Sequence, residues 1–162
     1  MNQNLLEAIR LRAVGESESS RQLLLDLVAA QPDDPLILYQ CAWTHDAMGL
    51  EREAVNFYER AIEAGLGDED LAGALLGLGS TLRGLGEFGR AVAILEKGAK
   101  LFPSHRPIRI FLAMAHYNAN RSKEAVSGLL KLLLEASEDP AIAGYRKAIL
   151  QYAEDLDRIG ER

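Results

Sequence analysis

Cysteine is scarce in this sequence, and an N-terminal targeting pattern is missing. Cys41 is the single cysteine, so an internal disulfide is excluded and the thiols are too few for a cysteine-rich zinc site. The N-terminal stretch MNQNLLEAIR has no basic region followed by an apolar run, so we expect no secretory signal. Both shortages favour a reducing compartment, and we expect a cytoplasmic protein.

Long apolar runs and an excess of positive charge are also missing. The most apolar late stretch, AVSGLLKLLLEA, contains Lys131 and is shorter than the ~20 residues of a membrane-spanning helix. Acidic residues outnumber lysine and arginine by 24 to 18, and the net charge of -6 gives no attraction to phosphate backbones. We therefore expect neither a membrane nor a nucleic acid as a partner.

The residues that are abundant favour helix. The chain has only 5 prolines among many Ala, Leu, Glu and Arg residues, and its 48% hydrophobic content is that of a soluble protein. Its 162 residues are enough for one domain with a real core. We therefore expect a single helical domain.

A unit of about 34 residues recurs along the chain. The turn residues lie 34 residues apart from Gly15 to Gly49, 37 apart from Gly49 to Gly86, and 34 apart from Gly86 to Asn120. The clearest copy is residues 74–103, ALLGLGSTLRGLGEFGRAVAILEKGAKLFP. It resembles the tetratricopeptide pattern W-x-x-L-G-x-x-Y, A-x-x-x-F, P. The matching residues are Leu75, Leu78, Gly79, Leu82, Ala91, Leu95 and Pro103.

This resemblance implies an all-α fold, a right-handed superhelix of antiparallel helix pairs. The 37-residue interval predicts a three-residue insertion near the segment GLGDED. The predicted single domain spans 1–162, with repeats at about 1–34, 35–68, 72–105 and 106–139 and a capping helix at about 140–159.

Local chemistry supports these boundaries. Asp34 precedes Pro35 and Asp139 precedes Pro140, and each pair predicts a capped helix start. The four turn residues are expected to adopt the left-handed conformation that ends a helix. The first helix departs from the pattern, and a shift of one residue turns Leu5, Ala8 and Ile9 inward instead.

The C-terminal stretch predicts an amphipathic capping helix with one charged face. The alternative is that its apolar stripe pairs with a second copy of the chain. The stripe consists of Ile142, Tyr145, Ile149, Tyr152, Leu156 and Ile159.

Catalytic and metal-binding patterns are weak. Cys41 and His45 share a helix face, as a nucleophilic thiol and its base do, but both occupy core positions of the repeat. His105 and His116 are too far from them to complete a metal site. No strand leads into the glycine-rich strings, so a phosphate loop is not expected. We predict no enzyme activity, no catalytic residue, no cofactor and no metal.

In tetratricopeptide proteins the first helix of each repeat lines the concave surface, so the resemblance implies an apolar, aromatic groove. Such surfaces are typical of protein interfaces. The competing interpretation is that these side chains pack against each other between repeats. The predicted groove residues are Tyr39, Trp43, Asp46, Leu76, Ser80, Arg83, Ile110, Met114 and Tyr117, with Phe111 at the rim.

Some family members grip chaperone tails with a carboxylate clamp, which this chain does not match. The clamp positions hold Leu5, Ile9, Gln40, Gly73 and Gly77. We predict instead an interaction module that holds an apolar or amphipathic segment of a protein partner in its groove. The alternative is a structural homodimer formed through the groove or the C-terminal helix.

Overall fold

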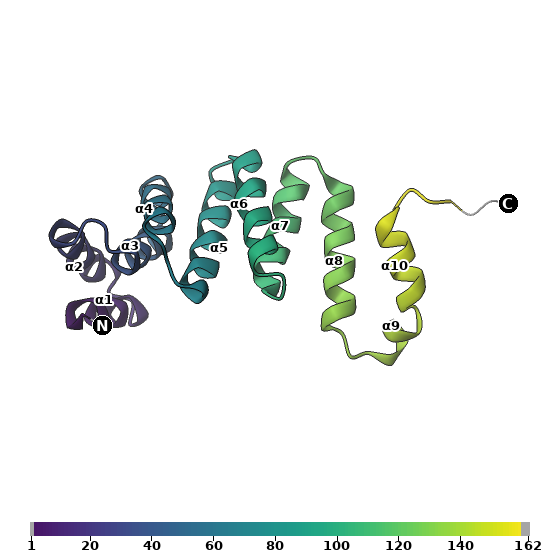
Figure 1. Ribbon diagram of the computed structural model, residues 1–162, viewed down its shortest axis with the longest axis horizontal. Helices are drawn as coiled ribbons and strands as arrows, with labels where there is room; N and C mark the ends of the chain where they lie inside the picture. Colours follow the sequence, from purple (N-terminus) through teal and green to yellow (C-terminus); the bar gives the residue numbers. More distant parts are fainter. Residues whose placement is uncertain (1, 160–162) are drawn as a thin grey trace.

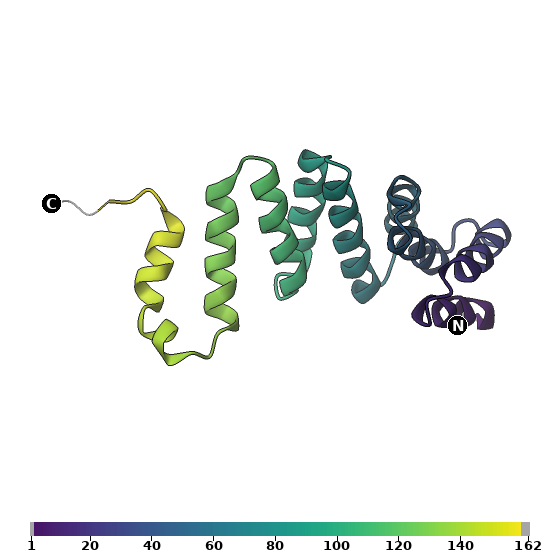
Figure 2. The ribbon, with the colours of Figure 1, turned by 180° about the vertical axis from the view of Figure 1, so that it is seen from behind.

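The computed structural model describes residues 2–159, which form ten α-helices and no strand. Figures 1 and 2 show these helices stacked side by side along one axis, with α1 near one end and α10 at the other. The helices are α1 (Gln3–Ala13), α2 (Ser17–Ala30), α3 (Pro35–Ala47), α4 (Glu51–Ala64), α5 (Asp68–Gly84), α6 (Phe88–Leu101), α7 (Arg106–Asn118), α8 (Ser122–Ala136), α9 (Pro140–Gly144) and α10 (Arg146–Glu154).

The first eight helices form four hairpins, each packed on the next. Helices α1, α3, α5 and α7 also contact one another across the repeats, so they form one continuous layer. This arrangement confirms the predicted all-α solenoid of helix pairs. The layer of first helices presents residues from every repeat on one surface.

The hairpin turns form where the sequence predicts them. Gly15, Gly49 and Gly86 have φ values of 87°, 73° and 80°, and Asn120 has a φ of 60°. These left-handed conformations end each first helix at the predicted residue. At the start of α3, one carboxylate oxygen of Asp34 accepts hydrogen bonds from two backbone N–H groups, at 3.0 and 2.9 Å. The predicted cap is therefore present.

The core runs in two clusters along the solenoid. The first-repeat cluster contains Leu5 and Ala8 from α1 together with Leu24, Ile37 and Cys41. The predicted shift of the first helix is thus confirmed for its buried side chains. The larger cluster joins the second, third and fourth repeats. Its large members include Leu38, Tyr39, Tyr58, Leu78, Leu82, Leu95 and Ile108.

The third repeat begins earlier than predicted. Helix α5 has 17 residues, whereas α3 and α7 have 13 each, and it starts at Asp68 rather than near residue 72. Gly65, with a φ of 94°, ends α4 just before it. The insertion therefore lengthens the first helix of the third repeat instead of forming a longer loop.

The C-terminal segment differs from the single helix expected over 140–159. It forms the short helix α9 and then α10, with a break at Tyr145, and the helix ends at Glu154. Gly144, a poor helix former, immediately precedes the break. The break divides the predicted apolar stripe between two helices. Two of its members, Tyr145 and Tyr152, are 71% and 51% exposed instead of buried.

Ala153 is the buried residue through which α10 faces the rest of the chain, and α10 packs on α8. Arg146 donates to the backbone oxygen of Leu134 at 2.9 Å, and Lys131 pairs with Glu154. Ile159, the last residue of the predicted stripe, lies beyond α10 and is 88% exposed. The C-terminal segment therefore covers α8 with a narrower apolar face than the sequence predicts.

Candidate functional site

The predicted groove residues lie on α3, α5 and α7 and surround two hollows. The first hollow, of about 350 Å³, is lined by Tyr39, Trp43, Asp46, Tyr58, Gly73, Leu76, Gly77, Ser80 and Phe111. The second hollow, of about 410 Å³, is lined by Arg83, Ala113, Met114, Tyr117, Asn118, Ala125, Val126 and Leu129. Nine of the ten predicted residues therefore line one hollow or the other.

An aromatic wall borders the first hollow. The rings of Tyr39 and Trp43 stack with their centroids 6.0 Å apart, and Tyr58 lies 6.3 Å from Tyr39. Trp43 is 47% exposed, whereas Tyr39 is only 8% exposed. Trp43 therefore offers the contact surface, and Tyr39 supports it from behind.

Two glycines on α5 make room for these tyrosines. A Cβ added at Gly73 would overlap the Tyr39 hydroxyl, and one added at Gly77 would overlap the Tyr58 ring. They lie four residues apart, so they share one face of α5. A larger residue at either position would collide with a tyrosine, so the packing of the first hollow depends on both glycines.

Polar groups of the first hollow are partly removed from water. The Tyr58 hydroxyl donates a long hydrogen bond of 3.5 Å to Oδ2 of Asp46. Burial raises the pKa of Asp46 above its ordinary value, and hydrogen bonds from Thr81 and Tyr58 oppose that rise. The pKa of Tyr58 is also raised, first by burial and then by the Asp46 charge. Tyr58 is therefore a hydrogen-bond donor throughout the physiological pH range.

Arg12 reaches the aromatic wall from α1. Its guanidinium lies 4.2 Å from the centroid of the Trp43 ring. It also donates to the side-chain oxygen of Gln40 at 2.6 Å and to Oγ1 of Thr44 at 3.0 Å. Burial lowers the pKa of Arg12, yet an arginine stays charged at any physiological pH. This cation holds one face of Trp43, and sequence reasoning did not find it.

The second hollow is apolar with one cation. Tyr117 is 68% exposed and Met114 is 37% exposed. Val126 and Leu129 of α8, each 45% exposed, extend this surface beyond the first helices that the repeat pattern predicts. Val126 and Leu129 are three residues apart and therefore share one face of α8. This spacing is the sequence signal that could have predicted their part in the surface.

Two predicted residues lie differently from expectation. Ile110 lines neither hollow and is 42% exposed. Phe111, expected at the rim, lines the first hollow and packs against the core. The side chains of the predicted set thus combine the two interpretations: some pack between repeats, and others remain exposed.

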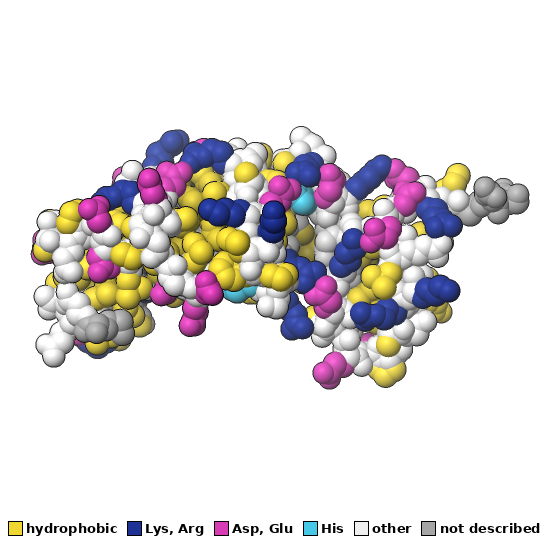
Figure 3. Space-filling view, in the orientation of Figure 1, with side chains coloured by type: hydrophobic (Ala, Val, Ile, Leu, Met, Phe, Trp, Pro, Cys, Tyr) yellow, Lys and Arg dark blue, Asp and Glu magenta, His cyan; other side chains and the backbone are white. Residues whose placement is uncertain are grey.

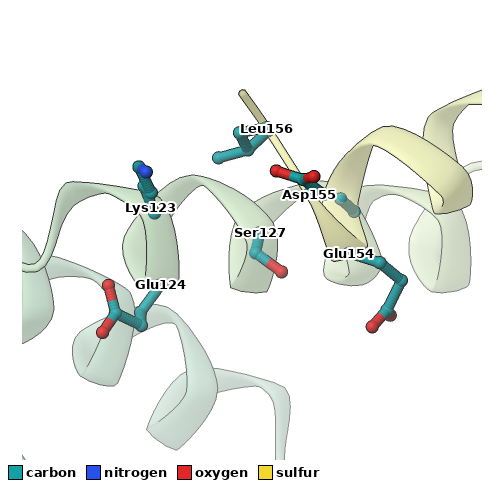
Figure 4. Close-up of a pocket in the computed structure, with 7 residues that line it drawn as sticks. Lys123, Glu124, Ser127, Glu154, Asp155 and Leu156 are labelled. Carbon is teal, nitrogen blue, oxygen red and sulfur yellow. The ribbon is translucent and has the colours of Figure 1, made fainter. Parts of the chain in front are cut away.

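Apolar surface gathers over the middle of the molecule. Figure 3 shows one face, where hydrophobic side chains cover the central helices and charged side chains of both signs extend over the C-terminal helices. A further hollow of about 190 Å³ lies near the C-terminus. Lys123, Glu124 and Ser127 of α8 line it together with Glu154 and Asp155 (Figure 4). Most of its lining is polar or charged, with Ala153 and Leu156 as the apolar members.

Cys41 and His45 are both buried in the core. Cys41 is fully buried, and burial raises its pKa to about 12. Nδ1 of His45 lies 2.7 Å from the backbone oxygen of Cys41, which makes Nδ1 the protonated nitrogen. A protonated Nδ1 accepts no proton from the sulfur, which is 3.6 Å away. This pair therefore has the geometry of a buried structural contact and lacks an activated thiolate.

Metal-ligand clusters and bilayer-length helices are both missing from residues 2–159. In this range no three His, Cys, Asp or Glu side chains come together as metal ligands. None of the helices in the same range has the length and hydropathy of a bilayer crossing.

Comparison with known proteins identifies a family. A family model described as tetratricopeptide repeat matches residues 35–156. Comparison with curated protein sequences gives no match. Among solved structures, MamA residues 41 to the end from Desulfovibrio magneticus RS-1 aligns with a TM-score of 0.75 at 16% identity, covering 96% of this chain and 92% of that one.

Two further solved structures are similar. A mutant form of MamA aligns with a TM-score of 0.70 at 21% identity over 79% of this chain and 73% of that chain. TTC0263, a thermophilic repeat protein of Thermus thermophilus, aligns with a TM-score of 0.60 at 21% identity, covering 95% of this chain and 92% of that one. At these identities the likeness shows the fold alone.

Proposed function

This chain belongs to the tetratricopeptide repeat family, a general scaffold for protein–protein interaction, and from that premise we propose that its groove holds an apolar or amphipathic segment of a protein partner. The observation that carries the proposal is the exposed apolar surface of the two hollows. Trp43, Met114 and Tyr117 keep 47%, 37% and 68% of their surface exposed. Large apolar side chains in a concave surface are the usual anchors of a protein partner.

The hollows also favour a partner over self-packing. Gly73 and Gly77 leave room for the tyrosines that line the first hollow, and the Trp43 ring contacts both the Arg12 guanidinium and the Tyr39 ring. A contact surface that is rigid before binding loses little conformational entropy when a partner docks. These features support Trp43 as the central anchor.

The two hollows together set the size of the occupant. The first hollow lies mainly on α3 and α5, with Tyr58 from α4 and Phe111 from α7, and the second lies on α5, α7 and α8. With neighbouring helix axes ~8 to 10 Å apart, a ligand that fills both must extend over roughly 20 Å. About six extended residues, or about thirteen in a helix, cover that distance.

A homodimer is the second candidate. Tyr145, at the break before α10, and Tyr152, on α10, are 71% and 51% exposed and line neither hollow. They lie seven residues apart, about two helical turns, so both rings can dock on one surface of a second copy. The homodimer would use the C-terminal segment and the partner complex would use the groove, so crosslinkers placed in the two regions distinguish the two candidates.

A site-specific photocrosslinker tests the proposal. We would replace Ser80, which lines the first hollow, by benzoylphenylalanine, and Ala93, an exposed residue of α6, in a matched control. We expect Ser80 to capture one defined polypeptide in cells that make the protein, and Trp43→Ala to abolish that capture. Equal capture from both positions would contradict groove binding. A third variant would carry the crosslinker at Tyr152. A crosslinked product of twice the chain mass from this variant, and none from the Ser80 variant, would favour the homodimer.

A further inference from the structure

Arg83 lies on α5 where the two hollows meet. Ser80, one turn earlier on the same helix, lines the first hollow, and Arg83 lines the second. Residues three apart on a helix share one face, so the two positions are neighbours on the surface of α5. A chain that fills both hollows therefore passes over the Arg83 guanidinium.

The positive charge of Arg83 has no carboxylate partner within the described residues 2–159. Its Nη1 donates to Oδ1 of Asn118 at 3.2 Å, and its buried Nε has no hydrogen-bond partner there. Other arginines of the solenoid do pair with a carboxylate, as Arg109 does with Glu135 through a bond of 2.8 Å. An incompletely satisfied cation in an apolar concave surface is an attractive point for an anion.

We infer that the groove recognises an apolar segment with an internal aspartate or glutamate, whose side-chain carboxylate pairs with the guanidinium of Arg83. This inference rests on the proposed function and adds the chemistry of the occupant. Ion pairing of this kind in a partly desolvated groove is stronger than on an open surface. The apolar residues of the segment supply the contact area, and the carboxylate fixes its register.

The surroundings of Arg83 place the carboxylate within the segment rather than at its end. Trp43 offers apolar surface on one side of Arg83, and Met114 and Tyr117 offer it on the other. A ligand that ended at Arg83 would leave one hollow uncovered. In the first hollow the Asp46 carboxylate repels an acidic ligand group, so Arg83 is the favoured position for the acid.

Selection from a random peptide library tests this chemistry before any partner is identified. The full chain would be the bait for displayed peptides of about twelve residues, which can span both hollows at ~3.3 Å per residue. Parallel selections would use Arg83→Gln, which removes the charge but keeps donor groups, and Trp43→Ala. We expect wild-type selections to enrich Asp or Glu flanked by apolar residues, and Arg83→Gln to lose that preference.

Affinity measurements then isolate the pair. Replacing the enriched acid by its amide in the peptide is expected to weaken binding to the wild-type chain about tenfold, and to change binding to Arg83→Gln little. The peptide comparison on the wild-type chain stands even if Arg83→Gln fails to fold. Selected peptides that bind through their C-terminal carboxylate and contain no internal Asp or Glu would contradict the inference.

The outcomes separate the role of Arg83 from groove binding itself. Suppose that the selected peptides are apolar, lack Asp and Glu, and bind the wild-type chain but not Trp43→Ala. This result would overturn the role of Arg83 and leave groove binding intact. Peptides that bind Trp43→Ala as tightly as the wild-type chain, or a selection that yields no binder, would overturn both.

Discussion

The guanidinium of Arg12 lies over the indole ring of Trp43, 4.2 Å from its centroid, although the two residues belong to different repeats. Its other contacts, to Gln40 and Thr44, anchor α1 to α3. The indole ring also stacks on the ring of Tyr39, at an interplanar angle of 28°. One cation thus joins the first repeat to the second and holds the exposed aromatic side chain of the groove in place.

Arg12→Ala is therefore expected to lower stability by about 1–3 kcal/mol, because the polar groups of Gln40 and Thr44 lose their donor and Trp43 loses a cation–π contact. Urea unfolding measures the change. Arg10→Ala is the matched control, since Arg10 is exposed and pairs with its exposed neighbour Glu7, and it should alter the midpoint little. Equal effects of the two variants would show that the Arg12 contacts are not stabilising.

Gly77→Ala is expected to destabilise the chain even though alanine is the better helix former. Its Cβ would overlap the Tyr58 ring, and overpacking of this kind costs about 1–3 kcal/mol. Gly84→Ala near the end of α5 is the control, because nothing lies within 4 Å of its added Cβ. Thermal unfolding should show a decrease for Gly77→Ala and no decrease for Gly84→Ala. The reverse order would mean that α5 does not approach Tyr58 closely.

The buried thiol of Cys41 predicts a pH dependence. Its folded pKa of about 12 lies above the ordinary value of 9.0, because burial disfavours the thiolate. The unfolded chain ionises first as pH rises, so the stabilisation is fully present below pH 9 and is lost between pH 9 and 12, by up to ~1.4 kcal/mol per pH unit. Cys41→Ala should remove this component of the slope in urea unfolding. Identical slopes for the two proteins, or fast thiol labelling at neutral pH, would contradict a buried thiol.

Removal of residues 140–162 tests the C-terminal segment as a cap. The segment packs α10 on α8, and its loss would expose apolar side chains at the end of the solenoid. We expect the shortened chain to aggregate or to melt less cooperatively. Size-exclusion chromatography and a thermal melt measure both effects. A monodisperse chain that melts at the original temperature would show that the segment is dispensable for the fold.

The repeat architecture could be predicted because it depends on local signals. Turn residues such as Gly49 and Asn120 determine where helices end through their backbone conformation, and Asp34 determines where α3 begins through a hydrogen bond to its own first turn. Each signal acts within a few residues. The length of α5 was not predictable in this way, because an insertion can extend a helix or a loop with the same spacing.

The exposed and buried members of the groove could not be separated from sequence. Tyr39 and Trp43 lie one turn apart on α3, yet their exposures are 8% and 47%, because Gly73 of the next repeat leaves room for the Tyr39 ring. Arg12 was missed for the same reason: its contact with Trp43 depends on the angle between two repeats. The break at Tyr145 was not predicted because the apolar period continues through Gly144, a poor helix former that precedes the break.

Trp43 emission tests the central claim most directly, because it is the single tryptophan and lies in the proposed contact surface. The measurement is the emission maximum of the isolated chain and of its complex with the polypeptide captured from Ser80. We expect a partly water-exposed spectrum that shifts to the blue when the groove is covered. Trp43→Ala should then weaken association by ~2 kcal/mol or more, with a smaller change in stability than a core truncation of ~3 to 5 kcal/mol. A spectrum that is already blue and does not respond to the partner, together with a Trp43→Ala chain that unfolds, would contradict the groove as the binding surface.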